Sequence, residues 1–215
     1  MGSVTIRKAD ASDAPFLARG ILESDRGHVG VGTWDFVLPM SDAERLDVLE
    51  AVVVAPERTY LHWSTFLVAE TDGAVVGCVA SHVPDDFHDD DLRRECLRVL
   101  EPKGWDEDRL ARCFEGARGR DYFGIRTTPS DAPRIEWVFT DPSFRGRGVS
   151  SALIADHLAS AAEADWYVGT YIGNTPAIAT YEKVGFKVFA EWRHADYERR
   201  FKAPGSVSLR RLRRG

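Results

Sequence analysis

From position 141 to 150 the chain reads Asp141-Pro142-Ser143-Phe144-Arg145-Gly146-Arg147-Gly148-Val149-Ser150. An apolar segment, Ile135 to Phe139, precedes this run and predicts a strand, and small and apolar residues from Ser150 to Ala162 predict a helix after it. Closely spaced glycines let a backbone approach a bulky anion, and free N–H groups at a helix start can bind that anion. Arg145 and Arg147 add positive charge. The run therefore predicts a pyrophosphate-binding turn, with a plain tight turn and solvated arginines as the alternative.

Two common nucleotide-binding motifs do not fit this run. The chain contains no GxxxxGK[ST], so a P-loop is excluded. A GxGxxG fingerprint also fails, because Ser151 stands where its last glycine is required. Neither a P-loop protein nor a Rossmann protein is expected.

The run instead resembles the cofactor motif of the GNAT superfamily of N-acetyltransferases. That motif consists of a strand, Arg or Gln, two residues, Gly, one residue, Gly or Ala, and a helix. Arg145 to Ser150 matches except at Ser150, where serine replaces the slightly smaller alanine. A second match lies downstream, where Asn174 to Phe186 is similar to the family's Asn-to-Tyr helix ending in Gly-Phe. Asn174 is suited to capping that helix, and it can also bond a cofactor amide.

The resemblance implies an α/β (α+β) fold with a mixed, mostly antiparallel central sheet flanked by helices. The strands should splay after Ile135 to Phe139, so that acetyl-CoA enters between that strand and the strand Trp166 to Ile172. The pyrophosphate would lie on the turn, and the pantetheine arm would pair with the main chain of the first strand. The implied cofactor-binding residues are Val138, Phe139, Thr140, Arg145, Gly146, Arg147, Gly148, Val149, Ser150, Ser151 and Asn174.

Two residues are candidates for proton transfer. Tyr181 occupies the family's general-acid position, where a phenol would protonate the departing thiolate, and its alternative role is an aromatic core anchor. We choose Glu136 as the base that takes the amine proton through water, because a carboxylate is unusual in an otherwise apolar strand, and a water chain is the alternative base. Strand alternation predicts that Glu136 shares a face with Val138. A solvated or salt-bridged Glu136 is the equal alternative.

The reaction is expected to proceed by direct attack of a neutral amine on the thioester. None of the cysteines, Cys78, Cys96 and Cys113, lies in either motif, so no covalent acyl-enzyme is predicted. The cysteines form no CxxC pair, and the histidines have no metal-ligand spacing, so no metal is expected. His82, at the end of a predicted strand, is interpreted as structural, with a place in the acceptor pocket as the alternative.

Most other elements follow from local patterns. The segment Ser3 to Arg7 predicts a strand, and capping residues after Asp10 predict a helix to about Leu22. A loop at Gly27 to Gly32 separates this helix from a second helix starting near Ser41. The later predicted elements are a hairpin of Phe66–Ala69 and Val75–Ala80 around Asp72-Gly73, strands Trp166–Ile172, Phe186–Trp192 and Val207–Leu212, and a helix Thr175–Val184.

The segment from Pro84 to Pro133 is charged and helical in pattern. We interpret it as an insertion that covers the site within a single domain of residues 1–215, since no linker or repeat divides the chain. An insertion over the site should narrow it, which favours a small-molecule amine as acceptor. A protein N-terminus or lysine remains an alternative acceptor. An acyl-CoA sensor, or a catalytically silent interaction domain, is the alternative to an enzyme.

Composition limits the remaining function classes. The chain has 215 residues, 44% of them hydrophobic, which is enough for one substantial core. A net charge of -6 argues against nucleic-acid binding. No apolar run approaches the roughly 20 residues of a membrane span, and no secretory leader is recognised at the start of the sequence, so no membrane partner and a cytoplasmic location are expected. A homodimer through the final strands is a further expectation.

Overall fold

The structure is a computed structural model that describes residues 4–118 and 128–213. Ser3 of the first expected strand, and residues 119–127 of the expected insertion, lie outside the described residues. The strands are β1 (Thr5–Lys8), β2 (Phe66–Thr71), β3 (Ala74–His82), β4 (Arg134–Thr140), β5 (Trp166–Tyr171), β6 (Lys187–Arg193) and β7 (Gly205–Arg211). The α-helices are α1 (Ala14–Arg26), α2 (Thr33–Val37), α3 (Asp42–Val53), α4 (Asp89–Leu100), α5 (Glu107–Arg118), α6 (Val149–Ser160), α7 (Thr175–Lys183) and α8 (Ala195–Phe201).

The described strands form a seven-stranded sheet in the order β1-β2-β3-β4-β5-β7-β6. Every neighbouring pair is antiparallel except β4 and β5, which are parallel. Those two strands pair only where they begin, at Arg134 with Tyr167 and Ile135 with Val168. Beyond Ile135 the ladder ends. The predicted mixed, mostly antiparallel sheet with splayed strands is confirmed.

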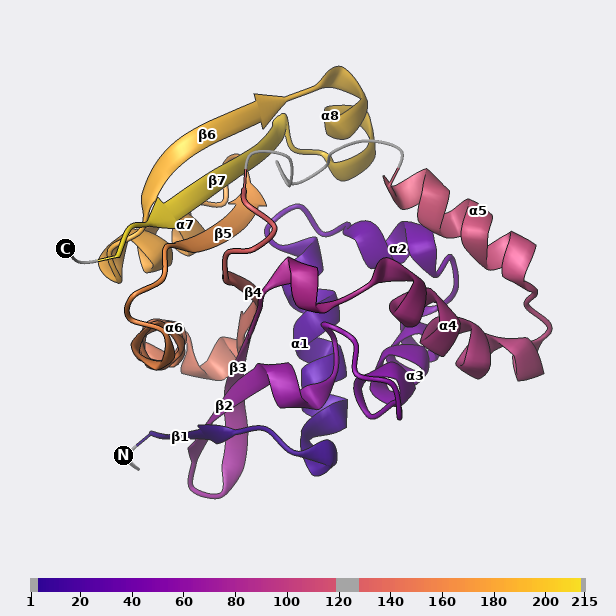
Figure 1. Ribbon diagram of the computed structural model, residues 1–215, viewed down its shortest axis with the longest axis horizontal. Coiled ribbons are helices and arrows are strands. Elements are labelled where there is room, and N and C mark those ends of the chain that lie inside the picture. The colour runs from indigo at the N-terminus through magenta and orange to yellow at the C-terminus, as the bar shows by residue number, and fades with distance from the viewer. Residues whose placement is uncertain (1–3, 119–127, 214–215) are drawn as a thin grey trace.

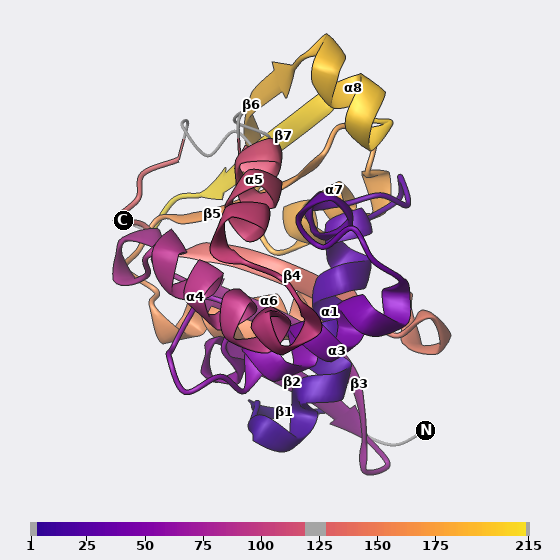
Figure 2. The same cartoon turned by 90° about the vertical axis from the view of Figure 1, so that its right-hand side faces the viewer.

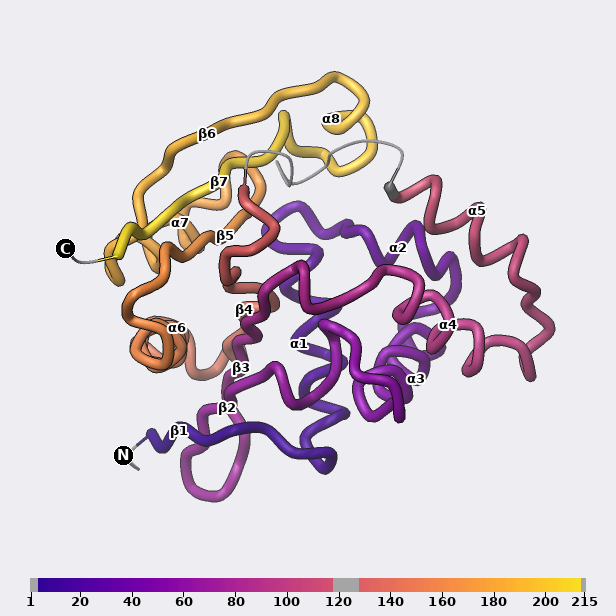
Figure 3. The backbone as a smooth tube through the Cα atoms, viewed as in Figure 1, coloured from indigo at the N-terminus to yellow at the C-terminus, as the bar shows by residue number. Residues whose placement is uncertain are grey.

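Helices cover both faces of the sheet (Figure 1). On one face α1 packs against β3 and β4, with α2 and α3 against α1. This face holds the larger apolar cluster, which includes Leu17, Ile21 and Phe139. On the other face α6 packs against β2, β3 and β4 and contacts α7, around Leu153 and Ile154. The continuous trace in Figure 3 runs through the first-face helices before it reaches α6.

Helices α4 and α5 come from the segment expected to be an insertion. They extend the first face, since α4 packs on α3 and α5 packs on α2 (Figure 2). The predicted β2–β3 hairpin is confirmed, and its turn residues Asp72 and Gly73 both have positive φ, 51° and 78°. Positive φ at both central positions is typical of the tightest hairpin turns. Within residues 4–118 and 128–213, no helix is long and apolar enough to cross a membrane.

A β-bulge in β4 overturns one expectation from strand alternation. Glu136 pairs with Ala80 and Phe139 pairs with Cys78, so β4 carries one more residue than β3 between these pairs. Trp137 accommodates the bulge with a positive φ of 53°, which is unusual for a bulky residue. Glu136 lies on the face of its cross-strand partner Ala80, which belongs to the first-face cluster, whereas Val138 packs in the α6 cluster. The prediction that Glu136 shares a face with Val138 is therefore wrong.

Candidate active site

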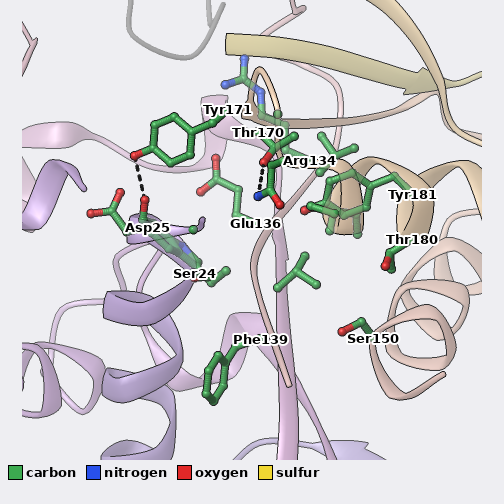
Figure 4. Close-up of a pocket in the computed structure, with 18 of the residues that line it drawn as sticks. Ser24, Asp25, Arg134, Glu136, Phe139, Ser150, Thr170, Tyr171, Thr180 and Tyr181 are labelled. Carbon is green, nitrogen blue, oxygen red and sulfur yellow. Dashed lines mark hydrogen bonds between the residues drawn. The ribbon is translucent and has the colours of Figure 1, made fainter. Parts of the chain in front are cut away.

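The splay between β4 and β5 opens into a cleft of about 1480 Å³. Figure 4 shows its centre, with Glu136 on β4 between Asp25 on one side and Tyr181 on the other. The α6 end of the cleft is the part lined by α7 and by residues of the stretch 138–151, without residues 141–143 and 147. The α2 end is the part lined by Tyr60 and by some of the residues in the stretches 23–37 and 82–89. Both ends meet at β4, beside Glu136.

Two left-handed glycines shape the α6 end. Gly146 and Gly148 have φ values of 76° and 80°, and a side chain at either position would project into open space. Gly148 is the N-cap of α6, so the first N–H groups of this helix lack a capping side chain. Such N–H groups and the helix dipole favour a bound anion. The turn therefore has the backbone that the pyrophosphate prediction requires.

Ser150, the departure from the family motif, has a structural contact. Its Oγ lies 2.7 Å from Oγ1 of Thr140, so a hydrogen bond ties the first turn of α6 to the last residue of β4. Serine at this position thus holds the turn against the strand and leaves the backbone of the turn free.

Nearly all of the predicted cofactor-binding residues line the cleft. Those that do are Val138, Phe139, Thr140, Arg145, Gly146, Gly148, Val149, Ser150, Ser151 and Asn174. Arg147 does not, because its guanidinium lies over the ring of Phe144 and donates a 3.1 Å hydrogen bond to the carbonyl of Ser143. Arg147 is therefore the one predicted cofactor-binding residue that does not line the cleft.

Asn174 differs from one of its two expected roles. It precedes α7, but its side chain makes no capping hydrogen bond. Its Nδ2 instead donates a 3.0 Å hydrogen bond to Oγ1 of Thr170 on β5 (Figure 4). The side-chain capping interpretation is wrong, because the amide is turned toward β5, and Asn174 lines the cleft.

Tyr181 lies on α7 and is only 5% exposed. Its ring packs in the α6 cluster against Phe186, so the aromatic-anchor role is present. Figure 4 shows its hydroxyl pointing from α7 toward the centre of the cleft. Burial raises the pKa of this phenol above its ordinary value, because the charged form loses hydration. The group therefore keeps its proton and can donate it to an anion in the cleft.

Glu136 and His82 meet at the junction of the two ends. The Glu136 side chain is 31% exposed and the His82 side chain 6% exposed, and Oε2 of Glu136 lies 4.0 Å from Nδ1 of His82. His82 stacks on Tyr60 at 5.4 Å between ring centroids, and the edge of Phe87 lies at 5.6 Å. His82 thus lies in an aromatic wall of the cleft, and Glu136 is the carboxylate in front of that wall.

Asp25 is a buried carboxylate that the sequence did not single out. It accepts a 2.8 Å hydrogen bond from the N–H of Trp34, at the start of α2. Burial raises its pKa to about 7. Its backbone carbonyl accepts a 2.8 Å hydrogen bond from the Tyr171 hydroxyl on β5. Gly32 permits this arrangement, because a Cβ there would lie 2.1 Å from Asp25 Oδ2.

Other lining residues also escaped prediction. Thr180 and Lys183 on α7 join the α6 end, and Arg134 on β4 and Phe114 on α5 line the cleft farther along. Thr180 and Lys183 could have been found from helical spacing relative to Tyr181 and Pro176, which lie on the same helix. Phe114 could not, because its place depends on how α5 docks on α2. Within the described residues, no group of three or more His, Cys, Asp or Glu could hold a metal ion.

Comparison with known families decides the class. Residues 34–186 match the model of the Acetyltransferase (GNAT) family. The chain belongs to the GNAT family. That stretch includes the α6 turn and ends at Phe186, the last residue of the second motif quoted above.

Solved structures agree on the GNAT fold. An N-acetyltransferase from Staphylococcus aureus Mu50 has a TM-score of 0.65 at 20% identity, over 96% of this chain and 99% of that chain. A histone acetyltransferase HPA2 and related acetyltransferase from Corynebacterium glutamicum has a TM-score of 0.63 at 20% identity, over 100% and 98%. Identities this low show the fold alone. An uncharacterized protein of Mycobacterium leprae, ML0378, is 35% identical over 82 residues, which span 35% of this chain and 23% of that protein.

Proposed function

We propose that this GNAT protein transfers an acetyl group from acetyl-CoA to a primary amine by direct attack. The observation that carries the proposal is the opening between β4 and β5, which leads from the uncapped start of α6 to Glu136 and Tyr181. The strand edge of β4 after Ile135 has no ladder partner on β5. An extended chain with amide groups, such as pantetheine, can pair with that edge.

The chain's residues fit acetyl-CoA along this path. The N–H groups of the Gly146–Ser151 turn would hold the pyrophosphate, and Arg145 and Lys183 would add positive charge. The main chain of Val138 to Thr140 would pair with the pantetheine arm. Acetyl-CoA supplies the activated thioester, so the residues need only position it and move protons.

The chemical roles follow from the groups around the centre of the cleft. Glu136 takes a proton from the amine as its nitrogen forms a bond to the carbonyl carbon of the thioester. An N–H near Val138 would hold the carbonyl oxygen while that oxygen carries negative charge. The carbon–sulfur bond then breaks with its electron pair on sulfur, and Tyr181 gives its proton to the thiolate. The products are an amide and CoA thiol, and Tyr181 regains a proton from solvent.

The walls of the α2 end support a small-molecule acceptor. Residues from the segment expected to be an insertion, including Phe87 and Phe114, close over the end of the cleft that is built by α1 and α2. A wall contributed by so many elements restricts the width available to an acceptor. The carboxylates of Glu136 and Glu23 would attract a cationic amine.

The experiment is a thiol-release screen of amines with acetyl-CoA, with the acetylated product identified by mass spectrometry. Small amines, amino acids, and peptides with free N-termini or lysines form the panel. We expect amine-dependent release with at least one small amine. Release with peptides alone would replace the small-molecule acceptor by a protein. Tight acetyl-CoA binding without release from any amine would support a sensor, and absence of binding would contradict both functions.

A further inference from the structure

His82 combines burial with an unused polar atom. Its side chain is 6% exposed, and Nδ1 has no hydrogen-bond partner among the described residues. A buried polar atom left unpaired is destabilising, so such atoms in native proteins call for an explanation. Oε2 of Glu136 lies 4.0 Å from Nδ1.

The ring of His82 is fixed in place by its neighbours. Tyr60 stacks on it with 23° between the ring planes, and Phe87 meets it edge-on at 86°. Glu136 is freer, because its side chain is 31% exposed. A movement of the carboxylate oxygen by about 1 Å would bring it within hydrogen-bond distance of Nδ1. Such contacts are often long in free enzymes and shorten when substrate binds.

We infer that His82 supports acetyl transfer through Glu136, by accepting on Nδ1 the proton that Glu136 takes from the amine. The inference rests on the proposed function, because Glu136 must first act as the base. The proton passes from the amine nitrogen to Glu136 and from Glu136 to Nδ1 of neutral His82. The resulting imidazolium then returns the proton to solvent, and no other bond changes.

Several charged groups face this pair and enter its pH dependence. Arg134 is the cross-strand neighbour of His82 in the β3–β4 ladder and lines the cleft. His88 and Asp89 at the start of α4 line the same region. Arg58 lies over the ring of Phe87 at 5.3 Å. A shift in a pH profile alone could therefore come from any of these groups, so the test must isolate the link between His82 and Glu136.

The test is a double-mutant cycle of His82→Phe and Glu136→Gln, with amine-dependent thiol release as the readout. Phenylalanine keeps the stack on Tyr60 and removes both ring nitrogens. We expect His82→Phe to lower kcat on the order of 10-fold while the KM of the amine stays within about 3-fold. In the Glu136→Gln background the same change should have no further effect, because the two residues act as a unit.

A matched control is His194→Phe. His194 also stacks on an aromatic ring, Trp192, at 5.5 Å, and it does not line the cleft. Its substitution should leave kcat unchanged. The loss in His82→Phe should also be larger at about pH 7 than at about pH 9, because hydroxide and neutral amine replace the relay at high pH.

Two results would overturn the inference while leaving the proposed function intact. One is a kcat for His82→Phe within about 2-fold of wild type. The other is a loss of the same size in the presence and absence of Glu136→Gln. If His82→Phe fails to fold, as judged by its melting temperature, His82→Asn gives the same cycle with a hydrogen-bonding group kept at the δ position. Absence of thiol release by wild type would contradict the proposed function itself.

Discussion

The α6 end and the α2 end of the cleft are built on different principles. At the α6 end the recognition groups are main-chain N–H groups held by two glycines with positive φ, and nearby side chains such as Ser150 brace the turn. At the α2 end the walls are side chains from α1, α2, β3, α4 and α5, and Asp25 is buried among them. A backbone site depends on a short local sequence. A side-chain site depends on the docking of distant segments.

This difference explains why the two ends constrain function unequally. The α6 turn favours an anion, because the first N–H groups of α6 have no capping side chain, and the proposed donor carries a pyrophosphate. The α2 end limits its ligand only by shape, aromatic walls and negative charge. Substitutions at the two ends should accordingly affect different kinetic constants.

The largest effect is expected where the two ends meet. Tyr181→Phe removes the proton donor and keeps the ring, so we expect kcat to fall on the order of 100-fold while the acetyl-CoA affinity stays within about 3-fold. Thiol release with the best amine measures this. Tyr197→Phe is the control, since Tyr197 is buried but does not line the cleft. An unchanged kcat for Tyr181→Phe would leave Tyr181 as an aromatic anchor only.

The next effect belongs to the α6 end. Gly148→Val places a β-branched residue at a φ of 80°, which strains the turn by about 1–2 kcal/mol or moves its N–H groups. We expect the KM of acetyl-CoA to rise about 10-fold with little change in the KM of the amine. Gly73→Val is the matched control, because Gly73 has a φ of 78° and open space but lies in the β2–β3 turn. Equal effects of both variants would contradict the role of the α6 turn.

A substitution at the α2 end should change the KM of the amine more than the KM of acetyl-CoA. A Cβ at Gly32 would lie 2.1 Å from Asp25 Oδ2, so Gly32→Ala must displace that carboxylate and weaken its hydrogen bonds to the start of α2. We expect a loss of about 1–3 kcal/mol in the free energy of unfolding, and a KM for the amine raised several-fold. Denaturant unfolding and thiol release measure the two quantities. Gly116→Ala on α5, with open space for its Cβ, should not destabilise the fold.

The smallest effect on turnover is expected at Asp25, where the predicted change is a pH dependence of stability. Burial raises its folded-state pKa from 3.8 to about 7, so the native state binds a proton there that the unfolded state has released between these values. The contribution of Asp25 to stability is therefore lost as pH rises through about 7. Asp25→Asn cannot titrate. We expect the melting temperature of wild type minus that of Asp25→Asn to decrease as pH rises from about 4 to about 8. A constant difference would show that Asp25 does not titrate in this way.

Local signals in the sequence predicted the elements that depend on a few adjacent residues. Asp72-Gly73 predicted its hairpin, because a tight turn depends on a few adjacent residues, whereas the splayed strands were expected from the family resemblance. Helices α2 and α8 were missed. Part of the reason at α2 is that its first N–H groups are bound by Asp25, a residue of another helix. Short helices of this kind depend on tertiary contacts more than on their own pattern.

Most residues of the candidate site were predicted from the sequence, but several of their contacts were not. Glu136, Tyr181 and most cofactor-binding residues do line the cleft, although their roles stay predictions. The bulge at Trp137 has no local sequence signal, because positive φ is unusual for tryptophan and reflects the strand register. The contact of Arg147 with Phe144 also has no local sequence signal, because it depends on the path of the turn. Local sequence does not place Asp25 and His82 at the cleft either, because they reach it only through the packing of separate elements.

Isothermal titration of acetyl-CoA tests the contrast between the two ends most directly, with wild type, Gly148→Val and Gly32→Ala compared side by side. We predict that wild type binds acetyl-CoA, that Gly32→Ala binds it with an affinity within about 3-fold of wild type, and that Gly148→Val binds it about 10-fold more weakly. Absence of binding by wild type, or a weaker affinity in Gly32→Ala than in Gly148→Val, would contradict the assignment of the donor to the α6 end.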